Sequence, residues 1–222
     1  MATRLKKKKK NSPEKKPAKS DVIPFRAEKG EKIDLKSLAR DERTWKIIGA
    51  FFLLIALFLF ISFTSYLFNW EEDQAKVFNK GFSILFDDRI RVTNLLGKLG
   101  ALVSHFFIYN AFGIASFLIC TFFFVVGVNL LFRRTVFSIW RNLKYVTIGL
   151  LVLSVSLAFL FGNSRFPFGG AVGNMISEKL TGALGTIGTS AVLLLLALGY
   201  FIWQFNPAFN FPSKKTGTSF RK

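Results

Sequence analysis

The chain has 222 residues, of which 51% are hydrophobic, and its 31 Lys and Arg against 13 Asp and Glu give a net charge of +18 at pH 7. Apolar runs without acidic residues alternate with short charged segments, a pattern typical of a polytopic membrane protein and not of a soluble globular domain. The single cysteine, Cys120, lies inside an apolar run, which excludes a disulfide framework and a thiol pair for metal or redox chemistry.

Residues 1–44 are polar and strongly basic, with a lysine run over 6–10 followed by three prolines. Because such a segment has too few apolar side chains to offset the entropy cost of ordering, we predict a disordered basic tail. A short helix over 34–43, with Asp34 as its N-cap, could lie along the lipid surface. The first apolar run begins only at Ile47, too late for a cleavable signal peptide, so we expect it to remain as a membrane anchor.

The first predicted span covers residues 47–68 and contains no charged residue. A helix of that length reaches about 33 Å at a rise of ~1.5 Å per residue. It therefore crosses a hydrocarbon core of ~30 Å. Trp45 and Trp70 flank it, as expected of aromatic residues at the two membrane interfaces.

The connection over 69–93 combines acidic residues with scattered apolar ones. Asp87 and Asp88 could suggest a metal or acid–base site, but adjacent residues on a helix point apart and no histidine lies near them in the sequence. We therefore interpret them as solvated surface residues. Four apolar side chains recur at helical spacing, which predicts an amphipathic turn or two at the interface: Phe78, Phe82, Leu85 and Phe86.

The longest apolar stretch, residues 94–132, exceeds one membrane span. It could form one long tilted helix, or a shorter helix over 95–108 that breaks near Asn110 and Gly113 before a span over 112–132, and we favour the second arrangement. Small residues at three- and four-residue spacing predict a packed helix face at the start of this stretch: Gly97, Gly100, Ala101 and Ser104.

His105 is the only histidine, and an ionisable group at membrane depth is a functional candidate by default. No acidic residue lies within fifteen positions of it, however, and the predicted boundaries place it near an interface. We therefore interpret His105 as an ordinary polar contact and leave its role open.

Residues 145–161 form the third predicted span, and a glycine-rich segment with a turn at 167–170 leads to the fourth, at 185–205. The segment lacks the G-x-x-x-x-G-K-[ST] pattern of a phosphate-binding loop. Its glycines instead predict close helix packing through Gly182, Gly185 and Gly188. Together the spans predict an all-α integral membrane protein, a four-helix transmembrane bundle over 45–206, with 207–222 as the start of a cytoplasmic linker.

Positive charge is distributed unevenly between the predicted connections. Lys and Arg crowd residues 1–46, the loop 133–144 and the tail 207–222, so the positive-inside rule places both termini and this loop in the cytoplasm. DNA binding by the lysine run is less favoured than lipid contact or plain solvation, because no aromatic residue is interleaved to stack on a base. We expect anionic lipid headgroups to contact a set of these basic residues: Lys6, Lys7, Lys8, Lys9, Lys10, Arg133 and Arg134.

The order and spacing of these spans, over about residues 45–206, resemble the four-span N-terminal membrane domain of the FtsK/SpoIIIE family of bacterial DNA translocases. The basic N-terminal tail and the Pro- and Lys-containing tail after the fourth span add to the resemblance. The small-residue motifs that carry it are Asn94, Gly97, Gly100 and Ala101, then Phe112 and Gly113, and later Gly169, Gly170, Gly173, Leu180 and the segment 185–188.

The resemblance implies a division protein. In that family this domain sits in the bacterial inner membrane at the septum, forms a homo-oligomer that is a hexamer in the complete protein, and contacts other division proteins. A C-terminal RecA-like ATPase pumps the chromosomal DNA. The resemblance thus implies a membrane anchor and interaction module that couples division to chromosome segregation. The resemblance implies no catalytic residue, metal or cofactor in this chain. It also implies that contact with DNA is made only by a motor that this chain lacks.

A small multi-span channel or transporter subunit is the alternative function. Transport usually requires intramembrane charges or a polar path, and the first, third and fourth predicted spans contain no charged residue between their flanks. The sequence therefore favours the structural and interaction module.

The charge asymmetry predicts the orientation of the chain. A single cysteine introduced at Asn163 or Gly170 is expected to react with a membrane-impermeant thiol reagent in intact cells, whereas one at Ser138 or Ser213 is not. The mass shift of the labelled protein on a gel measures the reaction. Labelling at Ser138 without lysis would contradict the orientation.

Overall fold

A computed structural model of the chain describes residues 41–206, and every structural statement below concerns that part. The predictions made for the lysine run and for the linker over 207–222 lie outside the described residues, as do positions 34–40 of the helix predicted over 34–43, whereas positions 42–43 belong to α2.

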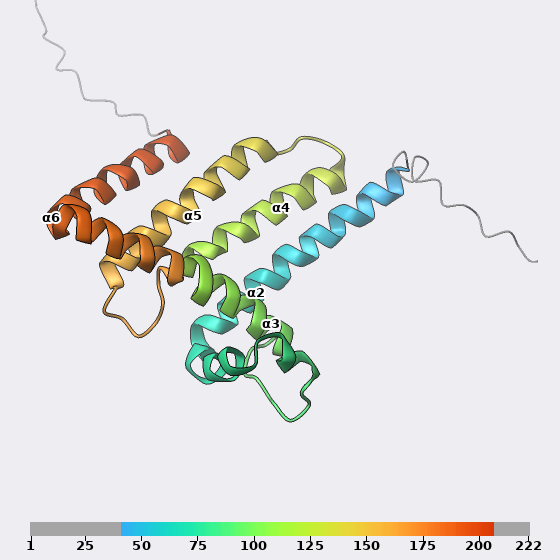
Figure 1. The fold of residues 1–222 in the computed structure, drawn as a ribbon. Helices are drawn as coiled ribbons and strands as arrows, with labels where there is room; N and C mark the ends of the chain where they lie inside the picture. Colours follow the sequence, from blue (N-terminus) through green and yellow to red (C-terminus); the bar gives the residue numbers. More distant parts are fainter. Residues whose placement is uncertain (1–40, 207–222) are drawn as a thin grey trace, which may run out of the picture. The chain divides into compact units, whose positions relative to one another are not determined.

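All described secondary structure is helical, and four helices are long and apolar enough to cross a membrane: Glu42–Phe78, Gly97–Phe132, Ile139–Phe161 and Gly170–Phe205. The all-α integral membrane fold predicted from the sequence is confirmed. In chain order (Figure 1) the elements are α2 (Glu42–Lys80), the 3₁₀-helix η1 (Gly81–Phe86), α3 (Gly97–Ser104), the π-helix η2 (His105–Phe112), the 3₁₀-helix η3 (Gly113–Ser116), α4 (Phe117–Phe132), α5 (Ile139–Phe161) and α6 (Gly170–Phe205).

Helix α2 is longer than the apolar run that predicts it. Asp41 caps its N-terminus, with Oδ1 accepting the N–H of Arg43 at 3.0 Å, and Gly81 ends it with a φ of 51°. Residues 69–80, expected to begin a connection, continue the helix, and the expected amphipathic turn lies at its end and in η1. The onset of charge marks the edge of the hydrocarbon layer, but backbone hydrogen bonds carry the helix beyond that edge.

The second apolar stretch is broken near Gly113, as favoured from the sequence. Helix α3 passes into the π-helix η2, and Gly113, at a φ of 63°, separates η2 from the 3₁₀ turn that leads into α4. The hydroxyl of Ser116 donates to the carbonyl of Phe107 at 2.6 Å. The backbone hydrogen-bonding pattern changes here from a π-helix to a 3₁₀-helix, and no water is present inside the membrane to bond a free carbonyl. The Ser116 hydroxyl gives the Phe107 carbonyl a hydrogen-bond partner within the protein.

The membrane-crossing helices pack in a row. The backbone of α2 packs beside α4, that of α4 beside α5, and that of α5 beside α6, whereas the backbone of α2 does not approach α5 or α6, and that of α4 does not approach α6. Helix α6 also packs on η2 and η3 of the second span. Figure 1 shows α2, α4, α5 and the second half of α6 side by side. Within this helical bundle, α2, α4, α5 and the second limb of α6 thus form an open row, while the second and fourth spans meet where α6 packs on η2 and η3. The main buried cluster lies where α2 meets η2 and α4: Leu59, Phe63, Tyr66, Ile108 and Cys120.

Two glycines allow α2 and α4 to approach at backbone distance. A Cβ on Gly49 would lie 2.5 Å from the backbone nitrogen of Leu131, and one on Gly127 would lie 2.8 Å from the side chain of Leu53. Because lipid offers no hydrophobic drive for helix association, this close van der Waals contact is what joins the first two spans.

Helix α6 has two limbs. Gly185 adopts a φ of 70° and a ψ of 172°, which no helix contains, and it separates a limb over 170–184 from a limb over 186–205. The fourth span predicted over 185–205 covers the second limb, and the helix that can cross the membrane starts earlier, at Gly170. The first limb packs against α5 and the break at Gly113, and the second turns back along α5, where the hydroxyl of Tyr200 donates to the carbonyl of Tyr145 at 3.3 Å.

A glycine junction, made of Gly113, Gly169, Gly170 and Gly173, ties the α5–α6 loop to the break in the second span. The N–H of Ile114 donates to the carbonyl of Phe168 at 2.9 Å. A side chain on Gly113 would overlap that carbonyl, and one on Gly170 would overlap the carbonyl of Ala111. Both glycines also have positive φ, so backbone geometry and space each require glycine there.

The other half of the junction holds α6 against α5. The hydroxyl of Ser154 donates to the carbonyl of Gly169 at 2.6 Å, and a Cβ on Gly173 would lie 2.5 Å from the carbonyl oxygen of Ser154. The junction therefore joins three segments that are distant in sequence: the break at Gly113, the middle of α5 and the start of α6.

Gly113→Ala and Gly170→Ala are each expected to destabilise the purified protein by about 2–5 kcal/mol, because a Cβ overlaps a backbone carbonyl at a positive φ. Unfolding in detergent, followed by circular dichroism against denaturant, measures the loss.

Gly182→Ala is the matched control, since nothing lies within 4 Å of a Cβ at that position and its φ is not positive. It should leave stability unchanged or raise it by up to about 1 kcal/mol. Equal effects of the three substitutions would contradict the packing described for the junction.

Candidate lipid-contact and interaction sites

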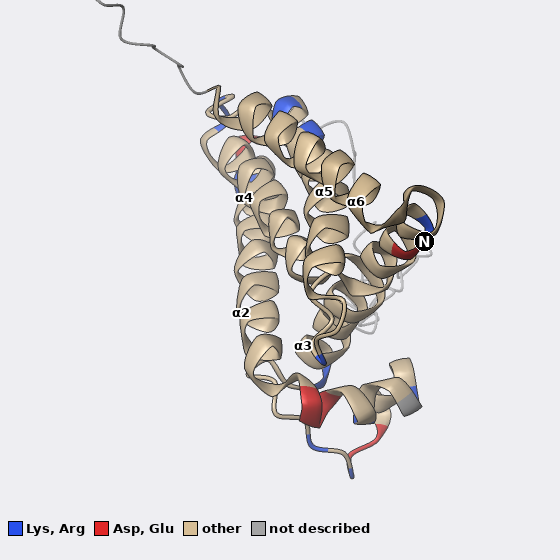
Figure 2. Cartoon of the chain, turned by 90° about the vertical axis from the view of Figure 1, so that its left-hand side faces the viewer, with Lys and Arg blue, Asp and Glu red and all other residues tan. Residues whose placement is uncertain are grey.

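The middle parts of α2, α4 and α5 carry no charged residue, whereas α6 carries Glu178 and Lys179 in its first limb. Figure 2 shows these middle parts of α2, α4 and α5 as long tan stretches. Many large apolar side chains on these stretches are exposed, Phe51, Leu54 and Leu57 of α2 among them. A surface of that kind requires lipid as its solvent, and the described chain is a multi-pass membrane protein.

One end of the row is basic. The loop between α4 and α5 carries Arg133 and Arg134, both exposed, and Arg141 and Lys144 follow in the first turns of α5. Asn129 fixes this loop, because its Nδ2 donates to the carbonyl of Phe137 at 2.6 Å and its Oδ1 accepts the N–H of Phe137 at 3.0 Å. The predicted contact of Arg133 and Arg134 with lipid headgroups fits their exposure and stays a prediction.

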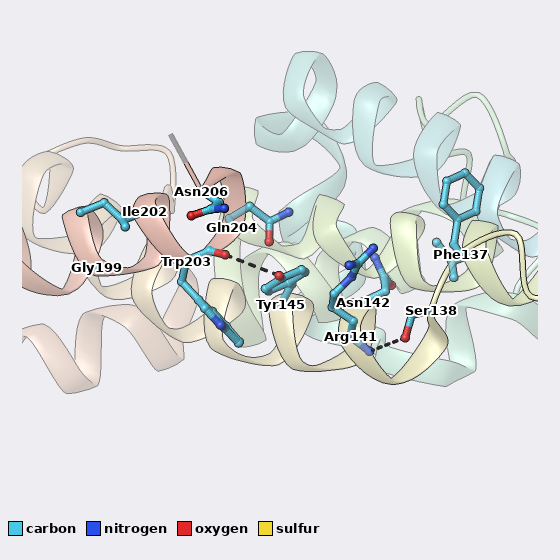
Figure 3. A pocket seen from close by; sticks show the side chains of 11 residues that line it. Phe137, Ser138, Arg141, Asn142, Tyr145, Gly199, Ile202, Trp203, Gln204 and Asn206 are labelled. Atoms are coloured by element: carbon cyan, nitrogen blue, oxygen red, sulfur yellow. Dashed lines mark hydrogen bonds between the residues drawn. The ribbon is translucent and has the colours of Figure 1, made fainter. Parts of the chain in front are cut away.

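A hollow of about 910 Å³ lies at the same end, between the start of α5 and the end of α6 (Figure 3). The rings of Tyr145 and Trp203 meet edge to face across it, with centroids 4.5 Å apart. Arg141 lies on the other side of Tyr145, and Gly199 leaves the α6 wall without a side chain. An aromatic pair beside a cation is the composition expected at the level of lipid headgroups.

The opposite end of the row is organised by Asp73. Its carboxylate is fully buried and accepts the N–H of Thr93 at 2.7 Å and the N–H of Asn94 at 2.9 Å. The amide of Asn94 in turn donates to the carbonyl of Ser62 at 3.0 Å, and the N–H of Leu95 donates to the hydroxyl of Ser65 at 2.9 Å. These bonds fasten the segment before α3 onto the side of α2.

Asp87 and Asp88 behave differently from Asp73. The ammonium of Lys80 lies 2.6 Å from Asp87, and this hydrogen bond, with a second from the N–H of Arg89, holds the pKa of the Asp87 carboxyl below its usual range. Asp88 is fully exposed, and its closest cation is Lys98 at 4.0 Å. Neither carboxylate joins the other in a shared site, in agreement with the surface role inferred from the sequence.

His105 is buried among aromatic residues at the start of η2. Its Nδ1 lies 3.3 Å from the hydroxyl oxygen of Tyr66, and its ring stacks on Tyr109 with centroids 4.9 Å apart. π-helices are frequent at functional sites, but here the Tyr66 contact links η2 to α2, the Tyr109 contact lies within η2, and neither involves an acid. Within residues 41–206 no three His, Cys, Asp or Glu side chains lie close enough to hold a metal ion.

The residues predicted to pack helices have different surroundings. Gly97 has a φ of 64° and open space around it, whereas Gly100 and Ala101 are buried against the Asn94 turn and α2. Gly113 belongs to the glycine junction. By contrast, Gly182 and Gly185 meet nothing within 4 Å, and Gly188 meets only Leu184 of its own helix. This chain's own helices therefore do not make the packing predicted at the last three.

Other glycines make the close contacts that the sequence analysis does not assign. Gly49 and Gly127 join α2 to α4, and Gly149 packs under Tyr200 and Leu118. The only sequence feature that could have predicted these contacts is a single glycine within an uncharged span. Such a glycine is less conspicuous than the glycine-rich segment before the fourth span. Gly170 is also too crowded for the cysteine proposed there as a label, so Asn163 in the same loop is the better labelling position.

Comparison with known protein families identifies the region to which the chain is similar. A family model described as the 4TM region of DNA translocase FtsK/SpoIIIE matches residues 42–211. No curated protein and no solved structure matches the chain. The matched range includes all four membrane-crossing helices described above.

Asp73→Ala is expected to destabilise the segment before α3 by about 2–4 kcal/mol, because each backbone N–H left unpaired in a buried site costs about 1–3 kcal/mol. Hydrogen exchange of residues 87–96 in the detergent-purified protein measures the effect. Asp73→Asn keeps an acceptor oxygen and should lose less.

Asp88→Ala is the control, since an exposed carboxylate 4.0 Å from its partner should change stability by less than about 0.5 kcal/mol. Equal protection of residues 87–96 in the Asp73 and Asp88 variants would show that the buried carboxylate does not hold this segment.

Proposed function

The chain belongs to the family of 4TM regions of DNA translocase FtsK/SpoIIIE, since well over half of it matches that region, and we propose that it is the membrane anchor and interaction module of a septal DNA translocase. In this role it couples cell division to chromosome segregation from the bacterial inner membrane. The observation that carries the proposal is the family match over a chain that folds into four membrane-crossing helices.

The arrangement of the helix ends supports a cytoplasmic position for whatever is attached to the chain. Helix α2 starts, and α6 ends, at the end of the row that holds the basic α4–α5 loop (Figure 1). The positive-inside rule favours the cytoplasm for that end. A motor joined after α6 would then lie where ATP and chromosomal DNA are, and the chain would contact DNA only through that motor.

The open row supports a role in association. Its outermost helix, α6, packs on α5, η2 and η3, and its second limb exposes a series of large apolar side chains. We propose that this chain forms a homo-oligomer, a hexamer in the complete translocase, and that it contacts other division proteins. Gly182, Gly185 and Gly188, which meet no helix of their own chain, are the proposed contact positions on α6.

A fluorescent fusion of residues 41–206 is expected to concentrate at the division site. The range starts at Asp41 because that residue caps α2. A fusion of residues 41–80, which contains α2 alone, is the matched control and should label the whole envelope. Uniform fluorescence of the longer fusion would contradict a role at the septum and favour the channel or transporter alternative.

The purified chain is expected to release no phosphate from ATP above the rate measured with empty detergent micelles. Phosphoryl transfer requires a phosphate cradle and a carboxylate that positions Mg²⁺, and the sequence lacks the cradle motif. ATP hydrolysis that follows the protein through purification would contradict the assignment of this chain as an anchor without a motor.

A further inference from the structure

Two adjoining hollows run from the basic end of the row toward its middle. The first is the hollow of about 910 Å³ between α5 and α6 (Figure 3), and the second, of about 700 Å³, lies along α2 and α4. They share three wall residues: Val125, Phe137 and Asn142. Each has the size of a small-molecule site, which typically measures ~300–1,000 Å³.

The open row explains why the first hollow exists. Helices α4 and α6 both pack on α5 but their backbones do not approach one another, so Val125 of α4 and Gly199 of α6 line the same space over the start of α5. Gly199 adds no side chain to that space, and nothing lies within 4 Å of a Cβ built at that position.

The two hollows differ in chemistry. The wall of the first includes the cation Arg141, the amides of Asn142, Gln204 and Asn206, and no acidic residue. Among the described residues no carboxylate lies within ion-pair distance of Arg141; the ion pairs that the structure contains involve other cations. The wall of the second is almost wholly apolar, with Leu53, Leu57 and Phe60 from α2 and Cys120 and Phe124 from α4.

We propose that the two hollows together form a binding site for one anionic phospholipid. The phosphate lies beside Arg141 at the level of Tyr145 and Trp203, and an acyl chain follows the apolar groove between α2 and α4. A free anion would use only the first hollow, and a wholly apolar ligand only the second. A phospholipid matches both, because its charged headgroup lies at the membrane surface and its acyl chains extend into the membrane, as the polar and apolar hollows do.

The unpaired cation selects the charge of the headgroup. Arg133, Arg134 and Lys144 add positive charge near the first hollow, and each basic residue near a membrane surface favours anionic lipid by about 1 kcal/mol. A headgroup with net negative charge therefore binds more tightly than a zwitterionic one with the same acyl chains.

The test is native mass spectrometry of the purified full chain with added phosphatidylglycerol or phosphatidylcholine of matched acyl chains. The wild-type protein is expected to retain one phosphatidylglycerol in preference to phosphatidylcholine. Arg141→Gln should weaken phosphatidylglycerol binding about fivefold, the equivalent of about 1 kcal/mol. Arg134→Gln removes the same charge outside the wall and should weaken binding less.

A second variant tests the space rather than the charge. Gly199→Leu adds a side chain to the wall of the first hollow, at a position where a Cβ meets nothing within 4 Å, and should abolish lipid retention. Ala191→Leu enlarges an exposed side chain on the same limb of α6 outside that wall and should not. The thermal stability of both variants in detergent shows that each remains folded. Retention of phosphatidylglycerol by both Arg141→Gln and Gly199→Leu at the wild-type level would overturn the proposal.

The position of the acyl chain is tested with phosphatidylglycerol that carries a photoreactive diazirine in one chain. Cross-links are expected on the peptides that contain Leu53 to Phe60 and Cys120 to Val125, and Gly199→Leu should remove them. Cross-links spread evenly over the four spans, or equal retention of the two lipids by the wild-type protein, would show a general lipid shell and overturn the proposal.

Discussion

The close approach of two backbones at Gly113 and Gly170 is the constraint on which the rest of the structure depends. Neither position has room for a Cβ, and the Ile114–Phe168 hydrogen bond forms only because both lack one. This contact fixes where the second span breaks and where α6 begins. It thereby sets the start of the first limb of α6, and, through the kink at Gly185, the side of α5 along which the second limb returns.

Irregular backbone inside a membrane must find its hydrogen bonds within the protein, because lipid supplies none. Serine hydroxyls serve this need at three points. Ser116 donates to the carbonyl of Phe107 beside the break, Ser62 donates to the carbonyl of Gly100 at 2.7 Å where α3 meets α2, and Ser154 donates to the carbonyl of Gly169 at the glycine junction. These three serines are thus structural partners of backbone carbonyls.

The apolar runs predict the number of spans and the all-α fold, because the thickness of the hydrocarbon layer dictates the length of each run. The break in the second span is predicted by Gly113 together with Asn110. The packing glycines are harder to predict. Gly182 and Gly49 look alike in a sequence, but one faces open space and the other touches the backbone of α4. The difference depends on which faces of two helices meet, and the spacing of residues along one helix does not predict its neighbour. The anchoring role of Asp73 was equally hidden, because its partners Thr93 and Asn94 lie about twenty residues away.

The contacts between the helices join α6 to α2 by two routes, although the backbones of these two helices do not approach one another. One route runs through α5 and α4 to the Gly49–Gly127 contact. The other runs from the glycine junction to η2, which packs on α2 where His105 lies 3.3 Å from the hydroxyl oxygen of Tyr66. Both routes depend on glycines that let backbones touch, whereas at the basic end the hollow beside Tyr145 and Trp203 lies between α4 and α6.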